Sequence, residues 1–404
     1  MTLIQPFAGW RPRLGWAARV AAPPYDVLSS AEARLLAQDN PDSFLHVSKA
    51  EINLDPALPP DDALVYQTAK ERFEQMRHTG VLIQDATPCL YIYRLAMGER
   101  VQTGVVVAAS VAAYRSHRIR KHELTRPDKE NDRTRLADTL SAHSGPVFLI
   151  HRQTAALDDL VTRIQQAAPP DESFQADDGI QHSLWVVRDT PQIDQLVALF
   201  EQQSRLYIAD GHHRSAAAER ICTSRPTADH FLAVSFPDSQ VCILAYNRVV
   251  RDLNGLTPAE FLKAVGQHFQ VTPATGAVRP DRPHCFGLYV ARQWYRLTLD
   301  PGQVDATDAV ARLDVSLLDR YILQPILGIH DLRRDQRIDF VGGSRGTTAL
   351  AQRVDAGHMA AAFSLFPTQL AELMAVADAD QIMPPKSTWF EPKLRDGLVV
   401  QTFA

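Results

Sequence analysis

The residues with the clearest chemical potential lie in the string Leu206-Tyr-Ile-Ala-Asp-Gly-His-His-Arg-Ser-Ala-Ala-Ala-Glu219. An apolar strand is predicted to end at Ala209, Gly211 follows, and an alanine-rich helix is predicted over residues 215–222. Gly211 permits a tight turn and lets a ligand approach the backbone closely. The first turn of a helix presents N–H groups and a partial positive charge, which suit a phosphate. The string therefore predicts a phosphate-binding turn between a strand and a helix.

The side chains of this turn add to what its backbone offers. Arg214 is a bidentate donor for phosphate oxygens, and Ser215 beside it belongs to the same predicted phosphate-binding set. His212 and His213 donate hydrogen bonds, or act as acid or base near neutral pH. Asp210 is a candidate to orient a histidine, to hold Mg²⁺ or to accept a substrate proton.

Two alternatives for the same turn stay open. In the first, Asp210 only caps the helix and the histidines are merely exposed. In the second, His212 and His213 bind a metal ion, although adjacent histidines in one turn rarely aim at one ion.

A charged stretch, Arg118–Arg133, is the second candidate region. Glu123 comes just after a predicted strand and is a candidate catalytic carboxylate, and Lys129 and Arg133 downstream are candidate phosphate-binding cations. The signs of the charges are mixed, so long-range attraction to DNA is not implied. The alternative is that the charged residues of this stretch only form a solvent-exposed loop and helix face.

Two proline-rich segments also carry candidates. Asp26 follows Pro23-Pro24, whose extended path makes a rigid arm that could hold Asp26 over a pocket. The alternative is a turn that packs the arm on the core. Lys386 lies in Met383–Phe390 and could neutralise phosphate charge; the alternative is a structural strap anchored by its aromatic residues.

The elements that must position these residues alternate along the chain. Two strands, 89–94 and 102–111, are predicted to form a hairpin that turns at Met97–Arg100. Helix and strand signals interleave, so the fold class is mixed α/β, that is α+β. The other predicted strands are 44–47, 147–150, 184–187, 206–209, 231–236, 241–246 and strands near 285–299, and the main predicted helices are 29–40, 63–80, 191–203, 258–268, 313–324 and 368–377.

The length of 404 residues suggests two or three domains. The Asn-Gly and Pro residues in Asp252–Pro258 punctuate the chain. We therefore predict a nucleotide-binding domain over 1–250 and a C-terminal α+β domain over 251–404, with a strap at 382–393 that packs back on the site.

Composition excludes several classes of protein. Hydrophobic residues make up 45% and charged residues 22%, the balance of a globular protein. The net charge of −5 argues against a nucleic-acid partner. The four cysteines stand far apart, which argues against a zinc ribbon or a disulfide framework. The sequence has neither a signal-peptide pattern nor an apolar run of ~20 residues, so we predict a cytoplasmic protein without a membrane partner.

Familiar nucleotide motifs are missing. The string Gly342-Gly-Ser-Arg-Gly-Thr-Thr348 lacks the Gly-Lys-Ser/Thr ending of a P-loop and is interpreted as a turn or hairpin loop. Neither a Rossmann glycine fingerprint nor a nucleophile elbow is present. Any nucleotide site therefore depends on the turn at Gly211.

Five strings are distributed over nearly the whole chain: Ala21-Ala-Pro-Pro-Tyr-Asp-Val27, Lys121-His-Glu-Leu-Thr125, Asp210-Gly-His-His-Arg214, Tyr246-Asn-Arg-Val-Val250 and Met383-Pro-Pro-Lys-Ser-Thr-Trp-Phe-Glu-Pro-Lys393. In this order they resemble the bacterial family catalogued as domain of unknown function 1015.

The Asp210–Arg214 string is also similar to the phosphate motif of the ParB/sulfiredoxin superfamily. That superfamily includes nucleotide-dependent free-serine kinases, sulfiredoxin and the CTP-binding domain of ParB proteins. The resemblance implies a ParB/sulfiredoxin-like core with a C-terminal α+β extension, and phosphate binding at Gly211–Arg214. Sulfiredoxin needs a cysteine where this chain has His212, so sulfinic-acid repair is disfavoured.

The leading hypothesis is a small-molecule kinase that transfers phosphate from ATP or ADP, with Mg²⁺, to a hydroxyl of a serine-like amino acid or related metabolite. Glu123, Asp26 and Asp210 are the candidate proton acceptors. One alternative is a ParB-like nucleotide-binding switch, and another is a metal-dependent phosphohydrolase. The acceptor, the preferred nucleotide and the oligomeric state, a homo-oligomer included, stay open.

Overall fold

The computed structural model describes residues 2–404, and their contacts divide them into two compact units. The first unit contains the chain up to Lys121, then Thr125–Val241, and finally the C-terminal segment Pro392–Ala404. The second contains Cys242–Glu391 and the short piece His122–Leu124. Asn254 and Gly255, near which we expected the boundary, lie in a loop inside the second unit between β14 and α10, and Pro258 is the first residue of α10.

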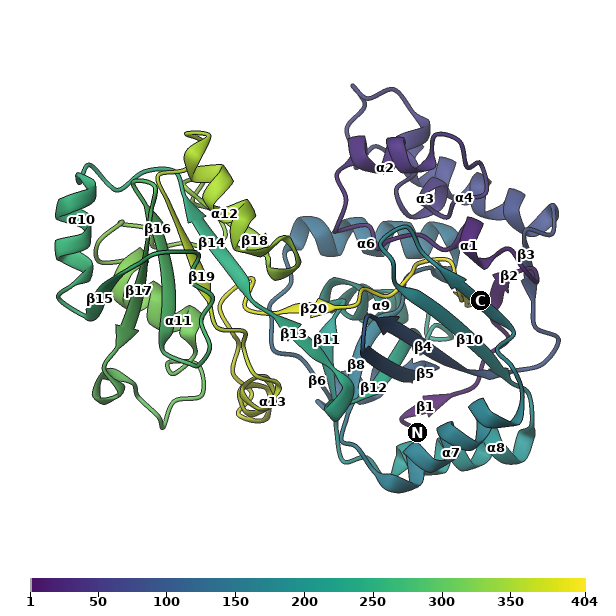
Figure 1. Ribbon diagram of the computed structural model, residues 1–404. Coiled ribbons are helices and arrows are strands. Elements are labelled where there is room, and N and C mark those ends of the chain that lie inside the picture. Colours follow the sequence, from purple (N-terminus) through teal and green to yellow (C-terminus); the bar gives the residue numbers. More distant parts are fainter. Residues whose placement is uncertain (1) are drawn as a thin grey trace. The chain divides into compact units, whose positions relative to one another are not determined.

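The first unit is built on a mixed nine-stranded sheet (Figure 1). The strand order is β6-β11-β8-β12-β5-β4-β10-β9, with β1 beside β5. The predicted hairpin is confirmed: β4 and β5 pair antiparallel from Tyr91 opposite Val106 to Met97 opposite Arg100. The strands are β1 (Ile4–Gln5), β4 (Leu90–Met97), β5 (Arg100–Ser110), β6 (Ile119–Arg120), β8 (Val147–His151), β9 (Glu172–Gln175), β10 (Gln181–Val187), β11 (Leu206–Asp210) and β12 (His230–Pro237).

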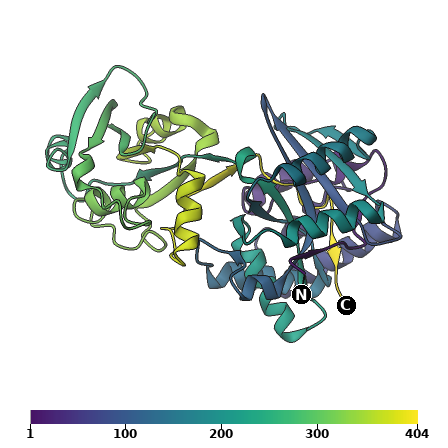
Figure 2. The same ribbon diagram turned by 90° about the horizontal axis from the view of Figure 1, so that it is seen from below.

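One face of this sheet is covered by α7 (Ala155–Ala167) and α8 (Thr190–Glu201), which lie side by side across it (Figures 1 and 2). Leu157 and Leu196 from these helices share a core with alternate strand residues such as Val107. The alternation arises because successive side chains of a strand point to opposite faces.

A second core lies under a layer of helices. It joins α2 (Ser30–Ala37), α3 (Leu45–Ser48), α4 (Ala63–His78) and α6 (Pro127–Leu140). Ser29 caps α2 in a reciprocal bond with Glu32, as its sequence predicts. The strand predicted at 44–47 is wrong: these residues enter α3, because an apolar run this short does not distinguish a strand from a buried helix.

The remaining elements of the first unit are short. They are β2 (Trp10–Pro12), α1 (Ala17–Val20), the 3₁₀ turns Ala50–Asn53 and Asp238–Gln240, β3 (Leu82–Gln84), α5 (Val111–Arg115), β7 (Ala142–His143) and β21 (Gln401–Thr402). The C-terminal segment is tied in by backbone pairing: β21 pairs with β7, and Asp396 pairs with Ala22. Residues from the two ends of the chain are thereby brought together within this unit.

The second unit contains a six-stranded antiparallel sheet in the order β15-β17-β16-β19-β14-β18. Its strands are β14 (Tyr246–Val250), β15 (Phe269–Ala274), β16 (Cys285–Val290), β17 (Gln293–Leu299), β18 (Ile338–Gly342) and β19 (Ala361–Leu365). A separate pair is formed by β13 (Cys242–Leu244) and β20 (Trp389–Glu391). The helices are α10 (Pro258–Val265), α11 (Asp314–Leu318), α12 (Gly346–Asp355) and α13 (Leu370–Asp378), with 3₁₀ turns at Pro301–Gln303 and Gly343–Arg345.

Two local expectations in this unit differ from the structure. The helix predicted over 313–324 is α11 followed by a π-helical turn, Asp319–Leu323. The segment Gly342–Thr348, predicted as a turn or hairpin loop, contains a 3₁₀ turn but no hairpin, because it leads from β18 through that turn into α12. Mixed helices and sheets in both units confirm the α+β class. Within residues 2–404, no helix combines the length and apolarity needed to cross a bilayer.

Candidate functional site

The turn at Gly211 joins β11 directly to α9 (His212–Ser224). Gly211 has φ of +94°, and a Cβ there would lie 3.2 Å from Val147 Cα, so both conformation and space favour glycine. The helix begins at His212, three residues before the predicted start, so His212–Arg214 form its first turn. Gly211 occupies the N-cap position, so the alternative in which Asp210 caps the helix is wrong.

Asp210 is held by a cation from the C-terminal segment. Lys393 Nζ lies 2.9 Å from Asp210 Oδ2, and Oδ1 accepts the N–H of Gly211 at 2.7 Å. Burial alone would raise the pKa of Asp210, but Lys393 and then Arg214 outweigh burial and hold it far below its usual value. Both oxygens of this carboxylate are engaged. The Mg²⁺-binding role of Asp210 stays a prediction.

The two histidines and Ser215 have positions that restrict their chemistry. His213 Nε2 accepts the backbone N–H of Arg126 at 3.1 Å, which links α9 to the start of α6. His212 is buried, with 6% of its surface exposed. Ser215 is fully buried, and its hydroxyl donates to the carbonyl of His212 at 3.0 Å. These contacts position the turn, and the ligand-binding roles predicted for the three side chains stay predictions.

Two arginines meet at a small cavity between α6 and α9. Arg133 comes from the second turn of α6 and Arg214 from the first turn of α9. Arg214 Nη1 donates to the carbonyl of Pro146, and Arg133 lies over the ring of Tyr25, 3.9 Å from its centroid. The cavity volume is about 30 Å³, and its lining comprises Tyr25, Arg133, Leu136, Ala137, His143, Ser144, Gly145, Arg214, Ala217 and Asp396.

The carboxyl group of Asp396 lines the same cavity. Only 3% of this residue is exposed, and its Oδ1 has no hydrogen-bond partner among residues 2–404. Burial raises the pKa of Asp396 to about 7, even though Arg214 acts in the opposite direction. Asp396 thus has a proton affinity suited to exchange near neutral pH.

Asp26 reaches the same cluster from the proline-rich arm. Its neighbour Tyr25 lines the cavity, while Asp26 itself is exposed. Burial lowers the pKa of Arg214, but Asp396 and Asp26 act against burial and the net pKa is raised. The arm therefore brings an exposed carboxylate close to the arginine of the turn.

The other three predicted residues lie outside this cavity. Lys129 is exposed on the first turn of α6, one turn before Arg133. Glu123 groups with the second unit, as does Lys386, whose Nζ lies 5.7 Å from the ring centroid of Tyr246. The phosphate-binding role of Lys386 and the catalytic role of Glu123 stay predictions.

Sequence reasoning missed Lys393 and Asp396. Lys393 ends the Met383–Lys393 string and Asp396 lies three residues after it, so both belong to a short charged run that follows Pro392. That run was the available signal, because charged side chains in a segment otherwise made of apolar residues must find partners.

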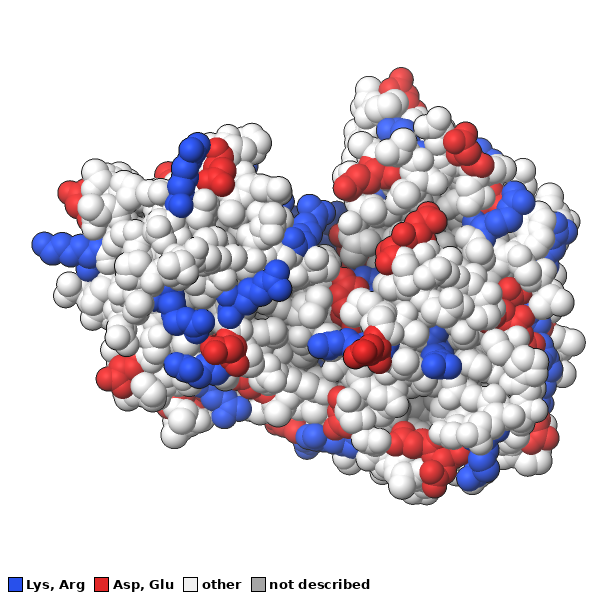
Figure 3. Space-filling view, in the orientation of Figure 1, with Lys and Arg blue, Asp and Glu red and all other residues white. Residues whose placement is uncertain are grey.

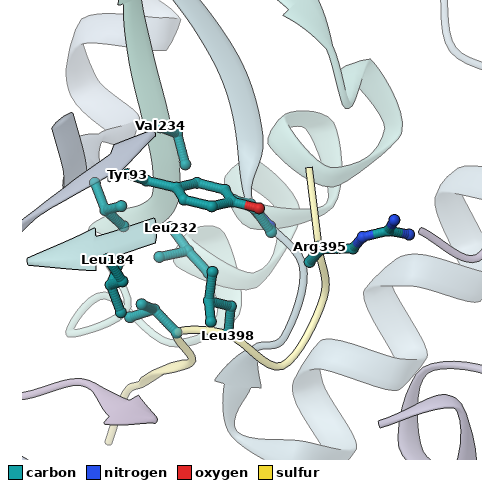
Figure 4. Close-up of a pocket in the computed structure, with 9 residues that line it drawn as sticks. Tyr93, Leu184, Leu232, Val234, Arg395 and Leu398 are labelled. Carbon is teal, nitrogen blue, oxygen red and sulfur yellow. The ribbon is translucent and has the colours of Figure 1, made fainter. Parts of the chain in front are cut away.

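A second cavity in the first unit has a structural role. Figure 4 shows Leu184, Leu232 and Leu398 gathered beside the Tyr93 ring, with the Arg395 guanidinium pointing away from them. Its volume of about 10 Å³ suits one water at most. The hydroxyl of Tyr93 lies 2.7 Å from Nδ1 of His182, whose Nε2 accepts from Arg395 at 3.3 Å. This network anchors the C-terminal segment to the sheet.

Charge on the surface is mixed. On the face shown in Figure 3, Lys and Arg side chains are interspersed with Asp and Glu side chains on both units. This pattern agrees with the net charge of −5. It gives that face no broad basic area of the kind that binds nucleic acid without sequence preference.

The family model described as "Protein of unknown function (DUF1015)" matches residues 4–316, so the chain belongs to this family, as its sequence strings predicted. No curated protein matches the chain. Among solved structures, it is similar to SbnI with C-terminal truncation from Staphylococcus aureus (TM-score 0.40, 12% identity, 72% of this chain and 85% of that chain). It is also similar to a free serine kinase in complex with AMP (TM-score 0.35, 11% identity, 71% of this chain and 86% of that chain). It is similar as well to a conserved hypothetical protein from Pyrococcus furiosus, with a TM-score of 0.35, 12% identity, and coverage of 72% of this chain and 93% of that chain.

Proposed function

We propose that this member of the DUF1015 family is a nucleotide-dependent kinase that phosphorylates a hydroxyl of a serine-like amino acid or a related metabolite. The ParB/sulfiredoxin-like architecture implied by the Asp210–Arg214 string is part of this proposal. The observation that carries it is the meeting of Arg133, Arg214 and the first turn of α9 around one cavity, with the Asp26 carboxylate close to Arg214.

The guanidinium groups of Arg133 and Arg214 would bind and orient the transferred phosphate. Phosphoryl transfer depends mainly on positioning and on stabilising charge, and a guanidinium offers paired donors to two phosphate oxygens. The first turn of α9 adds the favourable end of its dipole. A cavity of about 30 Å³ holds one or two waters, so only phosphate oxygens would enter it and the nucleoside would lie outside.

Asp26 is the carboxylate we assign as proton acceptor. In the transfer step, the acceptor oxygen forms a bond to phosphorus, the bond from phosphorus to the nucleotide oxygen breaks, and the hydroxyl proton passes to Asp26. Asp210 is less suited to this role because Lys393 holds its pKa low, and a weak base gains little from taking a proton. Asp396 would act behind Arg214, by balancing the charge of its guanidinium.

Nucleotide binding and turnover test the proposal. The full chain is incubated with ATP, ADP or CTP, Mg²⁺ and a panel of hydroxyl metabolites, and products are followed by ³¹P NMR. Arg214→Ala should weaken nucleotide binding about tenfold to hundredfold, from the ~1.5–3 kcal/mol of hydrogen bonds to a charged group. Asp26→Asn should leave binding intact and slow turnover by a factor of about 10²–10⁴.

The matched control is Arg220→Ala, because Arg220 is an exposed arginine on the same helix that pairs with Glu130. This variant should bind and turn over like the parent. Free phosphate without a phosphorylated acceptor would identify a hydrolase, and binding without turnover would identify a switch. If Arg214→Ala binds nucleotide as well as the parent, the phosphate site is misplaced.

A further inference from the structure

The second unit contains a fully buried arginine, Arg248, at the centre of its sheet. Arg248 lies on β14 with none of its surface exposed. It stands directly opposite Phe340 of β18 and Phe363 of β19. Its neighbour Val249 faces the core beneath α12, so Arg248 must point to the other face of the sheet. A charged side chain therefore occupies a largely aromatic layer.

Most of the donors of this guanidinium are not used by the protein. Nη1 donates to the carbonyl of Tyr246, two residues earlier on the same strand. Nε and Nη2 have no hydrogen-bond partner among residues 2–404. These two nitrogens lie on one edge of the planar group. That edge presents two parallel N–H donors, the arrangement that a carboxylate or a phosphate accepts with both oxygens.

An unsatisfied cation in such a place is costly. Burial lowers the pKa of Arg248 to about 10, so the group stays charged at neutral pH. Buried charges in native proteins are paired or hydrogen-bonded, because an unpaired one loses its hydration without compensation. A buried arginine that keeps two aligned donors unpaired therefore calls for an anion as its partner.

The segment above this face also has polar atoms without partners. Asp319 Oδ1 and Ser316 Oγ are buried and make no hydrogen bond within residues 2–404, while Asp319 Oδ2 accepts from Gln324 at 2.7 Å. Asp319 is near enough to Arg248 to raise its pKa, yet no bond joins them. Asp319 also begins the π-helical turn, a rare geometry that is frequently found at functional sites.

We propose that the second unit binds a small α-amino acid, with the ligand carboxylate on Nε and Nη2 of Arg248 and its ammonium group on Asp319 Oδ1. A zwitterion fits because the protein presents an unpaired cationic edge and an unpaired anionic oxygen close together. The site is separate from the cavity at Arg214 and does not rest on the proposed kinase activity. Because Arg248 is enclosed, ligand entry requires local opening of the segment 314–323.

Calorimetric titration of the full chain without nucleotide tests this proposal. The probes are glycine and L-alanine, which have no hydroxyl to phosphorylate, with acetate and methylammonium as half-ligands. The amino acids should bind at least tenfold more tightly than either half-ligand. Arg248→Met should weaken amino-acid binding at least tenfold, and Asp319→Asn should do so if the first variant folds poorly.

Two controls separate this site from the others. Arg353→Met removes a cation from α12 that pairs with Asp339 at 2.6 Å, and Arg214→Ala alters the proposed phosphate site. Both variants should bind the amino acids like the parent. The proposal is overturned if neither amino acid binds, or if Arg248→Met binds as the parent does. Greater thermal stability of Arg248→Met together with absent binding would identify a water-bridged Arg248–Asp319 pair instead.

Discussion

The pair formed by Lys393 and Asp210 is the most direct test at the scale of single residues. Lys393→Met leaves the Asp210 carboxylate partly buried without its ammonium partner, so the variant should lose about 1–3 kcal/mol of unfolding free energy. Adding Asp210→Asn should recover most of this loss, because the unpaired charge is then gone. Denaturant unfolding of the two single variants and the double variant measures the coupling.

The sign of the pH dependence follows from the same pair. The pKa of Asp210 is lowered in the folded protein, so its stabilising contribution is present above the usual aspartate range and is lost as the pH falls below it. Arg126→Met is the control, because Arg126 and Asp128 form an exposed pair that should contribute little. Additive effects of Lys393→Met and Asp210→Asn would refute the coupling.

The sequence indicated some residues that meet in the structure and left others unassigned for a physical reason. Gly211 and Arg214 could be found because glycine, polar residues and a small-residue helix follow one another locally. Asp396 and Lys393 could not be assigned, since their partners lie about 180 residues away in the chain and only the fold brings them together. Lys386 and Lys393 both follow a proline in one string, and spacing alone does not show which side chain has a carboxylate to meet.

At the scale of elements, the entry into α9 depends on the conformation of Gly211. Gly211→Ala places a side chain at φ of +94° and a Cβ 3.2 Å from Val147 Cα. We expect a loss of about 1–3 kcal/mol of unfolding free energy from backbone strain, and weaker nucleotide binding because the first turn of α9 shifts. Thermal unfolding and nucleotide titration of this variant measure the two effects.

Gly357→Ala is the matched control, because Gly357 has φ of +75° and no atom within 4 Å of its virtual Cβ. It should lose stability from strain alone and keep nucleotide affinity. Equal nucleotide affinity in Gly211→Ala and the parent would show that the turn is not part of the nucleotide site.

The helices and strands were predictable from the sequence where the hydrophobic pattern repeats several times. Helix α4 and the β4–β5 hairpin carry enough repeats of their hydrophobic pattern to distinguish the helical period of 3.6 residues from the strand period of 2 residues. The segments whose structure was not predicted are short, or their conformation depends on tertiary packing. Residues 44–47 offered one turn of apolar side chains, and Gly342–Thr348 offered glycines that suit a hairpin as well as a helix entry. The π-helical turn after α11 has no local sequence signature, since packing on the sheet decides it.

At the scale of the whole molecule, buried titratable groups are divided unevenly between the units. The first unit contains three histidines whose pKa burial lowers: His143 and His151 to about 4, and His182 to about 3. Against them stands Asp396, with a pKa raised to about 7. In the second unit burial raises the pKa of Asp314 to about 7.

These shifts predict opposite responses of the two units to acid. A histidine with a lowered pKa binds fewer protons when folded, so its contribution to stability is lost as the pH falls below about 6.5. An aspartate with a raised pKa binds more protons when folded, so stability rises as the pH falls from 7 toward 4. One pKa unit corresponds to about 1.4 kcal/mol, so acidification from pH 7 to 5 lowers the unfolding free energy by roughly 2 kcal/mol for each histidine. It raises the unfolding free energy by somewhat more than this for each aspartate.

The first unit should therefore lose about 3 kcal/mol of opening free energy between pH 7 and 5, and the second should gain a similar amount. Native-state hydrogen exchange, corrected for intrinsic rates, reports each unit through amides of β8 and β12 in the first and of β16 and β19 in the second. Asp396→Asn should deepen the acid loss in the first unit, because it removes a group whose raised pKa opposes the histidines. Asp314→Asn should reduce the gain in the second unit, where burial also raises the pKa of Asp319. A shift of both units in the same direction would mean that burial of these groups does not control the acid response.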